Sequence, residues 1–353
     1  MNAILFKFSL YFLGGIITSF ICNILLLNFS QSLGIRNKND VTIRWSNLSK
    51  PSLGGISFFA VFIFTTFIYA FFSYENLFHD VKFIGLFIAA VLAFIMGLAD
   101  DAYNTRPLIK LTVQILCGVA LCCTNTIISI TPYETINWVV TIFWVILLMN
   151  SLNMLDNMDG ITGTVVLMII ITCLCSQWMT FGITRNFWNI LNCAMTGGLI
   201  GFLYFNVNPS KLFMGDAGSQ FIGLFIAFIT IDDLWMVGTS NGVSNWYGLL
   251  LIVICFTAPF SDTLTVVINR LKRGQSPMVG GKDHTTHHLV YNGLNDRQVW
   301  YVFMGIATVA TMLTLAAIYL IKQGNLFFAS TLLLFPIAVF LRLYLITLRH
   351  PNK

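Results

Sequence analysis

Residues 82–101 read KFIGLFIAAVLAFIMGLADD, and this stretch decides the fold. Every side chain from Phe83 to Ala99 is uncharged, and the segment ends in two adjacent aspartates, Asp100 and Asp101. A helix needs about 20 apolar residues to cross the hydrocarbon core of a bilayer. The stretch therefore predicts a membrane-spanning helix that carries an acidic pair at one membrane surface.

The rest of the chain has the same apolar character. Of its 353 residues, 57% are hydrophobic and 9% are charged, and the mean hydropathy is +0.81. A soluble domain carries roughly 25% charged residues, so the composition excludes a soluble enzyme of ordinary build and a disordered chain. The apolar runs are continuous and do not alternate with polar residues, which disfavours a β-barrel.

Eleven apolar runs are long enough to be interpreted as spans. They lie at 4–28, 52–73, 82–99, 108–124, 136–152, 161–181, 188–205, 219–235, 245–268, 298–322 and 326–348. We predict an all-α integral membrane protein of about 11 transmembrane helices that forms a single domain over residues 1–353. The first run is too long for a removable signal peptide, and we expect it to be the first span.

The basic residues indicate the orientation of the chain in the membrane. With eleven spans, 15 of the 19 Lys and Arg residues fall on one face. Only Lys7, Lys82, Arg185 and Lys322 fall on the other. The positive-inside rule then predicts that the N-terminus lies outside and the C-terminus in the cytoplasm. No basic cluster is interleaved with aromatic residues, so we expect no nucleic-acid partner.

Five polar clusters lie at span ends on the predicted cytoplasmic face. The first, residues 50–55, begins with Lys50 and ends with Gly54 and Gly55. Two glycines at the start of a helix either expose N–H groups that hold an anion or allow tight packing, and both interpretations stay open here.

The second cluster is the pair Asp100 and Asp101, followed by Lys110 and Gln114. Adjacent carboxylates at the end of an apolar span raise each other's pKa, and desolvation adds to this cost. A divalent cation removes the penalty. The alternative is a pair of solvated loop acids.

The third cluster runs from Asn150 to Gly160. In a helix, Asn150 and Asn153 share a face, while Asp156 and Asp159 form a second pair with the same spacing. So many amide and acid side chains between apolar spans favour a functional site over an ordinary surface. An EF-hand is excluded because no bidentate Glu follows at the twelfth position.

The fourth cluster extends from Asn206 to Ser219 and includes Lys211, Phe213 and Asp216. Glycines on both sides of Asp216 suit a turn that leads into the next helix. There the carboxylate is suited to ligate a metal, while Lys211 is suited to meet a phosphate. The spacing of a P-loop is absent.

The fifth cluster holds His284, His287 and His288. Zinc is one interpretation, but no further Cys or His stands close enough in the sequence to be a clear fourth ligand. Because Arg270, Lys272 and Arg273 lie upstream, a phosphate-binding loop fits better. Together the five clusters favour Mg²⁺-assisted chemistry on a phosphorylated substrate whose partner resides in the bilayer.

At these residues the sequence resembles the polyprenyl-phosphate N-acetylhexosamine-1-phosphate transferases, a family that includes the phospho-MurNAc-pentapeptide translocase. The likeness extends over nearly the whole chain. Its motifs appear in family order: Pro-x-x-Gly-Gly at 51–55, Asp100-Asp101 with Lys110 and Gln114, the Asn/Asp string at 150–160, residues 206–219, and the histidine motif.

The resemblance implies that a UDP-HexNAc donates its sugar 1-phosphate to a polyprenyl phosphate, such as undecaprenyl phosphate, and that UMP is released. It also implies a Mg²⁺ cofactor, with Mn²⁺ as an alternative, and a multi-pass protein of the bacterial inner (cytoplasmic) membrane. A homodimer is compatible with it. Direct attack is favoured over a phospho-aspartate intermediate.

Roles at individual positions also follow from the resemblance. The catalytic residues would be Asp100, Asp101, Asp156 and Asp159, with Asp100 as the base that deprotonates the lipid phosphate. The metal ligands would be Asp216, Asp101 and Asp156. The substrate-binding residues would be Lys50, Lys110, Asn150, Asn153, Asn206, Lys211, Phe213, His284, His287 and His288.

The sequence departs from the family pattern at two places. Many members have His-x-His-His, whereas two threonines separate His284 from His287 here. The basic stretch that usually precedes Pro51 is replaced by Trp45-Ser46-Asn47-Leu48-Ser49-Lys50. The polar loop at 269–297 also lacks the bulk expected for a peptide-bearing sugar, so we expect a simple UDP-HexNAc and not a muramyl-pentapeptide donor.

Two other classes of protein compete with this interpretation. A CDP-alcohol phosphotransferase is also membrane-bound and rich in Asp, but only residues 156–160 match the start of its motif, and the Arg is missing. A cation transporter would place its ligands near the bilayer midplane, whereas these acids lie at span ends. We rank the first alternative above the second.

Overall fold

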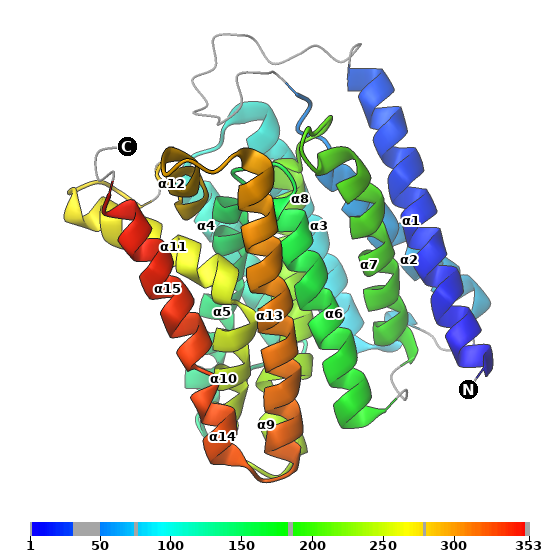
Figure 1. The fold of residues 1–353 in the computed structure, drawn as a ribbon. Helices are drawn as coiled ribbons and strands as arrows, with labels where there is room; N and C mark the ends of the chain where they lie inside the picture. The colour runs from blue at the N-terminus through cyan, green and yellow to red at the C-terminus, as the bar shows by residue number, and fades with distance from the viewer. Residues whose placement is uncertain (1, 31–49, 74–76, 183–185, 278–279, 350–353) are drawn as a thin grey trace.

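The computed structural model describes residues 2–30, 50–73, 77–182, 186–277 and 280–349, and all regular structure within them is helical (Figure 1). The long helices are α1 (Asn2–Ser30), α2 (Gly55–Phe72), α3 (Val81–Tyr103), α4 (Pro107–Cys123), α5 (Glu134–Leu155), α6 (Ile161–Phe181), α7 (Asn186–Asn206), α8 (Gly215–Thr230), α10 (Trp246–Cys255), α11 (Thr257–Lys272), α13 (Asp296–Lys322) and α15 (Leu334–Thr347). Shorter elements are η1 (Leu77–His79), the π-helical η2 (Ile231–Trp235), α9 (Val237–Ser240), α12 (Thr285–Tyr291) and α14 (Leu326–Thr331).

Each of the eleven apolar runs coincides with helix, which confirms the all-α class for the described residues. Eight helical segments are long and apolar enough to cross a membrane, or nine if α10 and α11 form one broken span. Among the remaining helices, α4 is shorter than these spans. Helix α7 carries Asn189 and Asn192 in its interior, which lowers its hydropathy. The chain is a multi-span membrane protein, and the count of about 11 spans stays a prediction.

The run at 245–268 is not one straight span. It is divided into α10 and α11, whose axes differ by 82°. Pro259 explains the break, because its ring clashes with the carbonyl of the residue four positions earlier and its nitrogen cannot donate a hydrogen bond. Proline is tolerated in the first turn of a helix, which is where α11 holds it. The run therefore forms two helices, and its interpretation as one span stays a prediction.

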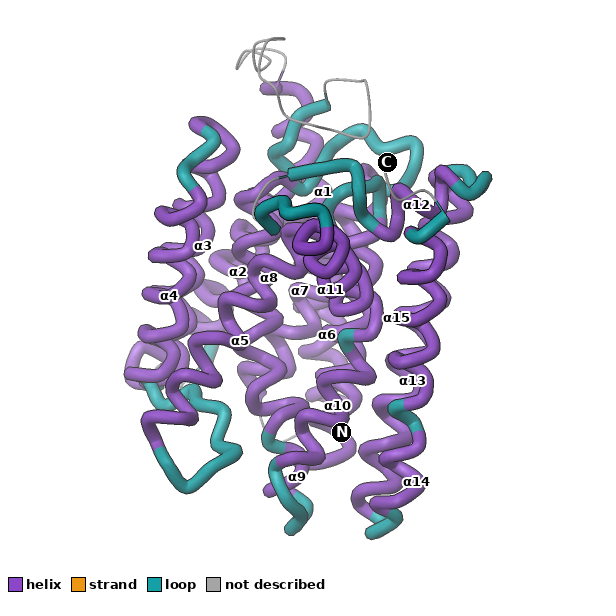
Figure 2. Tube along the Cα trace, turned by 90° about the vertical axis from the view of Figure 1, so that its left-hand side faces the viewer, coloured by secondary structure: helices purple, strands orange, loops and turns teal. Residues whose placement is uncertain are grey.

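The upper end of the bundle collects the polar clusters. The C-terminal ends of α3 and α5 and the N-terminal ends of α4, α6 and α8 meet there, together with α12 (Figures 1 and 2). The beginning of α1 lies at the lower end and the end of α15 at the upper end (Figure 1). An odd number of membrane crossings requires that the two ends of the chain lie on opposite sides, as they do here. The assignment of the upper end to the cytoplasm stays a prediction.

Candidate functional site

The backbone of residues 51–55 pairs directly with that of residues 213–214, and together they form one side of the site. The N–H of Gly54 donates to Phe213 O at 3.0 Å and the N–H of Gly55 to Met214 O at 2.8 Å, while Phe213 N donates to Pro51 O at 2.9 Å. These glycine N–H groups therefore bind the protein's own carbonyl oxygens. Of the two interpretations of the glycine pair, tight packing is confirmed.

Gly55 and Gly218 show why glycine is needed in this pairing. A Cβ atom built on Gly55 would lie 2.0 Å from the Cα of Gly218, which is closer than any real contact. The first turn of α2 thus lies directly against the first turn of α8. Asp216, in the same turn of α8, is positioned by this contact.

Five side chains from four helices form what we call the acid junction: Asp100 and Asp101 of α3, Lys110 of α4, Asn153 of α5 and Asp216 of α8. Lys110 forms an ion pair with Asp100 and lies 3.5 Å from an oxygen of Asp216. Asn153 Nδ2 donates to Asp216 Oδ1 at 2.6 Å, and Asp101 Oδ2 accepts from Ala217 N at 2.9 Å. One cation is thus shared by acids from two helices.

Asp100 is the most enclosed acid of the junction, with 3% of its side chain exposed. Its Oδ1 accepts from Thr105 N at 2.8 Å and from Thr105 Oγ1 at 2.6 Å, and its Oδ2 bonds Lys110. Both oxygens of this carboxylate are therefore engaged. A role as base requires that the contact with Lys110 opens when substrate binds.

A layer of buried amides lies one turn below the acid junction. Gln114 of α4 and Gln220 of α8 are 1% and 0% exposed. Gln114 Nε2 donates to Gln220 Oε1 at 3.1 Å, and Asn150 Nδ2 of α5 donates to Gln114 Oε1 at 2.8 Å. The layer links the three helices that carry Lys110, Asn153 and Asp216.

Asp156 follows α5 directly, and its pKa shows how close the acids are. Burial, followed by the negative charges of Asp216 and Asp101, raises the pKa of Asp156 to about 8. Asp159 adds to this effect. Asp101 and Asp216 therefore act electrostatically on Asp156.

Lys50, Asp159, Asn208, Ser210 and Phe213 form a second group, which we call the lysine corner. Lys50 Nζ lies 3.4 Å from Asp159 Oδ2 and donates to Ser210 Oγ at 2.8 Å. The same ammonium stands 5.1 Å from the centre of the Phe213 ring. Asp159 Oδ2 also accepts from Ser210 N at 3.1 Å. An aromatic face, a cation and a carboxylate thus lie together beside the acid junction.

Asn206 and Lys211 stand apart from these groups. Asn206 is buried, accepts from Gly160 N at 3.0 Å and donates to Leu212 O at 2.9 Å, so its amide holds two loops together. Lys211 is exposed, and its ammonium lies 6.0 Å from the ring centre of Tyr204. Neither residue contacts the acid junction, and their predicted substrate contacts stay predictions.

The three histidines begin α12 and are buried, with 6%, 2% and 2% of His284, His287 and His288 exposed. Thr286 Oγ1 donates to Asn157 Oδ1 at 2.6 Å, which ties α12 to the turn that carries Asp156 and Asp159. Burial lowers the pKa of His287 to about 3. His287 is therefore neutral at physiological pH.

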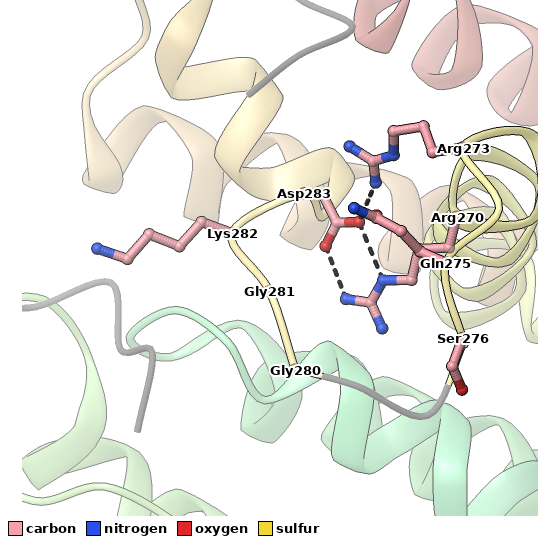
Figure 3. A pocket seen from close by; sticks show the side chains of 8 residues that line it. All are labelled: Arg270, Arg273, Gln275, Ser276, Gly280, Gly281, Lys282 and Asp283. Carbon is pink, nitrogen blue, oxygen red and sulfur yellow. Dashed lines mark hydrogen bonds and ion pairs between the residues drawn. The ribbon is translucent and has the colours of Figure 1, made fainter. Parts of the chain in front are cut away.

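A pocket of about 360 Å³ lies in the connection between α11 and α12 (Figure 3). Arg270 donates to Asp283 through Nε at 3.0 Å and Nη2 at 2.6 Å, and Arg273 Nη2 binds Asp283 at 2.5 Å. Burial alone would raise the pKa of Asp283, but these guanidinium contacts lower it to about 2. Lys282 extends away from this ion pair (Figure 3), whereas Lys272 bonds Tyr344 on α15.

Several residues of the site carry no motif of their own in the sequence. Thr105 and Gln220 are polar residues of common types, and Asp262 lies inside an apolar run. Asp262 and Gln220 were detectable in principle, because a polar residue inside a span is costly and points to a specific partner. The segment 45–49, where the sequence departs from the family pattern, lies outside the described residues.

The donor set suits a hard divalent cation. Mg²⁺ is usually held by one or two carboxylates together with substrate phosphates and water, and not by a complete protein cage. Among the residues that the structure describes, no three His, Cys, Asp or Glu side chains converge closely enough to hold an ion by themselves. The acid junction and Asp156 offer oxygen ligands that a substrate phosphate would complete.

Comparison with known proteins supports the resemblance inferred from the motifs. Residues 83–233 match the model of glycosyl transferase family 4. A "Probable undecaprenyl-phosphate N-acetylglucosaminyl 1-phosphate transferase" of Bacillus subtilis (strain 168) is 23% identical over 77% of this chain and 71% of its own length.

Two further relatives extend over more of the chain. A "Phospho-N-acetylmuramoyl-pentapeptide-transferase" of Streptococcus pneumoniae (strain Hungary19A-6) is 28% identical over 82% of this chain and 91% of its own length. An "Undecaprenyl-phosphate alpha-N-acetylglucosaminyl 1-phosphate transferase" of Escherichia coli O157:H7 is 26% identical over 88% of this chain and 82% of its own length. The predicted resemblance is confirmed, and the matched region contains every aspartate of the acid junction.

Proposed function

We propose that this chain, which matches glycosyl transferase family 4 over residues 83–233, transfers a HexNAc 1-phosphate from a UDP-sugar to a polyprenyl phosphate and releases UMP. The chain is a phosphotransferase whose relatives use undecaprenyl phosphate and N-acetylglucosaminyl 1-phosphate, as their names state. One observation carries the proposal: the acid junction, where acids and a lysine from three helices meet at the upper end of the bundle.

The reaction exchanges one phosphoanhydride bond for another. An oxygen of the lipid phosphate attacks the phosphorus that carries the sugar, and a new P–O–P bond forms. The bond from that phosphorus to the oxygen bridging the uridine phosphate breaks, and UMP leaves with the bridging oxygen. We favour this direct displacement over a phospho-aspartate intermediate.

The cofactor is proposed to be Mg²⁺, with Mn²⁺ as the alternative, held by Asp216, Asp101 and Asp156. When bound, such an ion neutralises charge that develops on the phosphate oxygens. The raised pKa of Asp156 supports the assignment, because acids that repel one another gain most from a shared cation.

Lys110 is proposed to meet the transferred phosphate. In the structure its ammonium is divided between Asp100 and Asp216, so an incoming phosphate competes with these two carboxylates for it. When Lys110 leaves Asp100, the carboxylate becomes free to take a proton from the lipid phosphate. This exchange of partners is how Asp100 would serve as the base.

The lysine corner is proposed to bind the uridine part of the donor. The Phe213 ring offers a flat apolar face, while Lys50 and Asp159 offer a donor and an acceptor beside it. Stacking together with a few polar contacts is how bases are commonly recognised. The histidines of α12 are proposed to contact the donor phosphates.

The donor is proposed to be a simple UDP-HexNAc, most specifically UDP-GlcNAc. The protein is proposed to lie in the bacterial inner membrane, where it would begin a lipid-linked glycan, and a homodimer is compatible with its fold. Two relatives are named for N-acetylglucosaminyl 1-phosphate transfer and one for a muramoyl-pentapeptide. The short α11–α12 connection supports the smaller sugar.

A panel of activated donors tests the proposal. Purified protein with undecaprenyl phosphate and Mg²⁺ is given UDP-GlcNAc, UDP-GalNAc, UDP-MurNAc-pentapeptide or CDP-diacylglycerol, and released nucleotide and labelled lipid are measured. We expect UMP and labelled lipid with a UDP-HexNAc, no product after EDTA, and recovery when Mg²⁺ is restored. CMP release with CDP-diacylglycerol would instead favour the CDP-alcohol phosphotransferase.

A further inference from the structure

Asp262 is a buried acid that the proposed reaction does not use. It belongs to the first half of α11 and is 0% exposed. A buried carboxylate is expected to have hydrogen-bond partners, because desolvation of an unpaired charge is costly. The partners of Asp262 all come from the start of α12: His284 Nδ1 at 2.9 Å, Thr285 N at 2.8 Å and Thr285 Oγ1 at 2.6 Å.

The contact with His284 determines which ring nitrogen is available. A carboxylate accepts hydrogen bonds, so the Nδ1 atom beside Asp262 carries the proton. The other nitrogen, Nε2, lies on the side of the imidazole turned away from Asp262. The two bonds to Thr285 fix the backbone next to His284, so both the ring and its attachment are held by one carboxylate.

The surroundings of His284 connect it to the rest of the site. Its ring packs edge-to-face against His287, with ring centres 5.4 Å apart. Thr286, two residues on, bonds Asn157 beside the acids of the α5–α6 turn. The titratable and charged groups that act on this region are Asp262 of α11, Asp283 and His287 near His284 in the chain, and Arg270, which pairs with Asp283.

We propose that Asp262 is a positioning residue for His284. It holds the imidazole with Nδ1–H toward α11, so that Nε2 carries no proton and accepts a hydrogen bond from a hydroxyl or N–H group of the bound donor. Asp262 itself contacts no substrate. The inference rests on the proposed function for the part that concerns the donor, whereas the arrangement of the Asp262–His284 pair is independent of it.

The first experiment is a double-mutant cycle. Asp262→Asn keeps the shape of the side chain, but its amide can donate to Nδ1, which moves the ring proton to Nε2. We expect kcat for UMP release to fall about 10- to 100-fold and KM for the donor to change less than about threefold. In a His284→Gln background the same substitution is expected to cost less than about twofold, because the group through which Asp262 acts is absent.

The second experiment observes the tautomer without any substrate. ¹⁵N-histidine NMR of the full-length protein in bilayers distinguishes protonated from unprotonated ring nitrogens, and the His284→Gln variant assigns the signal. We expect Nδ1 of His284 to be protonated in the wild type and Nε2 to be protonated in Asp262→Asn. An unchanged signal in Asp262→Asn would overturn the pairing.

Asp233→Asn is the matched control, because Asp233 is a second buried aspartate, 1% exposed, that accepts from Gln177 in another part of the bundle. It is expected to leave the His284 signal unchanged. An equal loss of activity from Asp262→Asn with and without His284 would show that Asp262 acts only on folding and would overturn the inference. A wild-type protein that is inactive with every donor, yet shows the expected tautomers, would overturn the proposed function and leave the pair established.

Discussion

Asp216 lies where three segments of the chain meet, and its two oxygens are approached by Lys110 and Asn153. Asp216→Asn would remove the charge that Lys110 and a bound cation require. We expect UMP release to fall by at least about 100-fold, in line with the loss of one preorganised electrostatic group. Steady-state assays at saturating donor measure the change.

Asp232→Asn is the control for Asp216→Asn. Asp232 also pairs with a lysine, Lys82, but it lies in η2, which follows α8 at the end away from Asp216, and its side chain is 25% exposed. Its replacement is expected to leave turnover near the wild-type value. Near-normal turnover in Asp216→Asn would contradict the assignment of Asp216 to the metal.

His287 is expected to make stability depend on pH. Its pKa in the folded protein is about 3, whereas the pKa of a histidine in an unfolded chain is about 6.5. Below pH 6.5 the unfolded state therefore binds a proton that the folded state does not, so stability falls as the pH decreases toward 3. Between pH 7.5 and 5.5 the loss from this residue is expected to be about 1 kcal/mol.

His287→Gln is expected to lose this dependence, while His79→Gln, which replaces an exposed histidine, is expected to keep it. Unfolding of both variants and of the wild type at pH 7.5 and 5.5 gives the comparison. The prediction fails if the wild type and His287→Gln respond to pH equally.

At the scale of single residues, the sequence supports the identification of the acids but not of their partners. Asp100 and Asp101 are recognisable because two carboxylates end an apolar run. The partner of Asp216 on α5, however, lies 63 residues away in the chain, and Lys50 and Ser210 are 160 residues apart. Which amide faces which acid depends on how the helices are arranged, and Asn206 shows that an amide in a motif can be engaged in loop contacts.

The amide layer is a feature of three elements, because α4, α5 and α8 each supply one member. Gln114→Leu would leave the amides of Gln220 and Asn150 buried with fewer partners. We expect the free energy of unfolding to fall by about 1–3 kcal/mol, the cost of unsatisfied buried polar groups. Thermal unfolding in detergent measures the loss, and kcat is expected to fall because Lys110 and Asp216 lie on the same helices.

Gln323→Leu provides a matched control for Gln114→Leu. Gln323 is exposed after the end of α13, so the same replacement removes no buried amide contact there. Equal unfolding temperatures for Gln114→Leu and the wild type would show that the amide layer does not hold the helices together.

At the scale of elements, hydropathy predicts where helices lie but not how they bend. All eleven apolar runs are helical because each offers a long, mostly apolar surface to lipid and to the bundle interior. The break before Pro259 was readable in principle from the proline alone. Its angle of 82° was not, because the direction of α11 depends on packing against α15 and α12.

For the whole molecule, the orientation predicted from basic residues has a direct test. Gln275→Cys lies in the α11–α12 connection and Gln323→Cys lies after α13, and both positions are exposed. The exposed native Cys123 is replaced by Ser in each variant. In intact cells, a membrane-impermeant maleimide is expected to label Gln323→Cys and to label Gln275→Cys only after the membrane is opened. The reverse pattern would place the acid junction outside the cytoplasm.

The close approach of Gly55 and Gly218 has a consequence for engineering this protein. On this side of the site, backbone lies against backbone with no room for one additional methyl group. Replacing either glycine by a residue with a side chain would therefore force the two helices apart. The α11–α12 connection is held by side-chain contacts, such as that between Arg270 and Asp283, and not by backbone packed this closely. A mutant library built to change the sugar donor should therefore leave residues 51–55 and 213–218 untouched and place its diversity in residues 270–283.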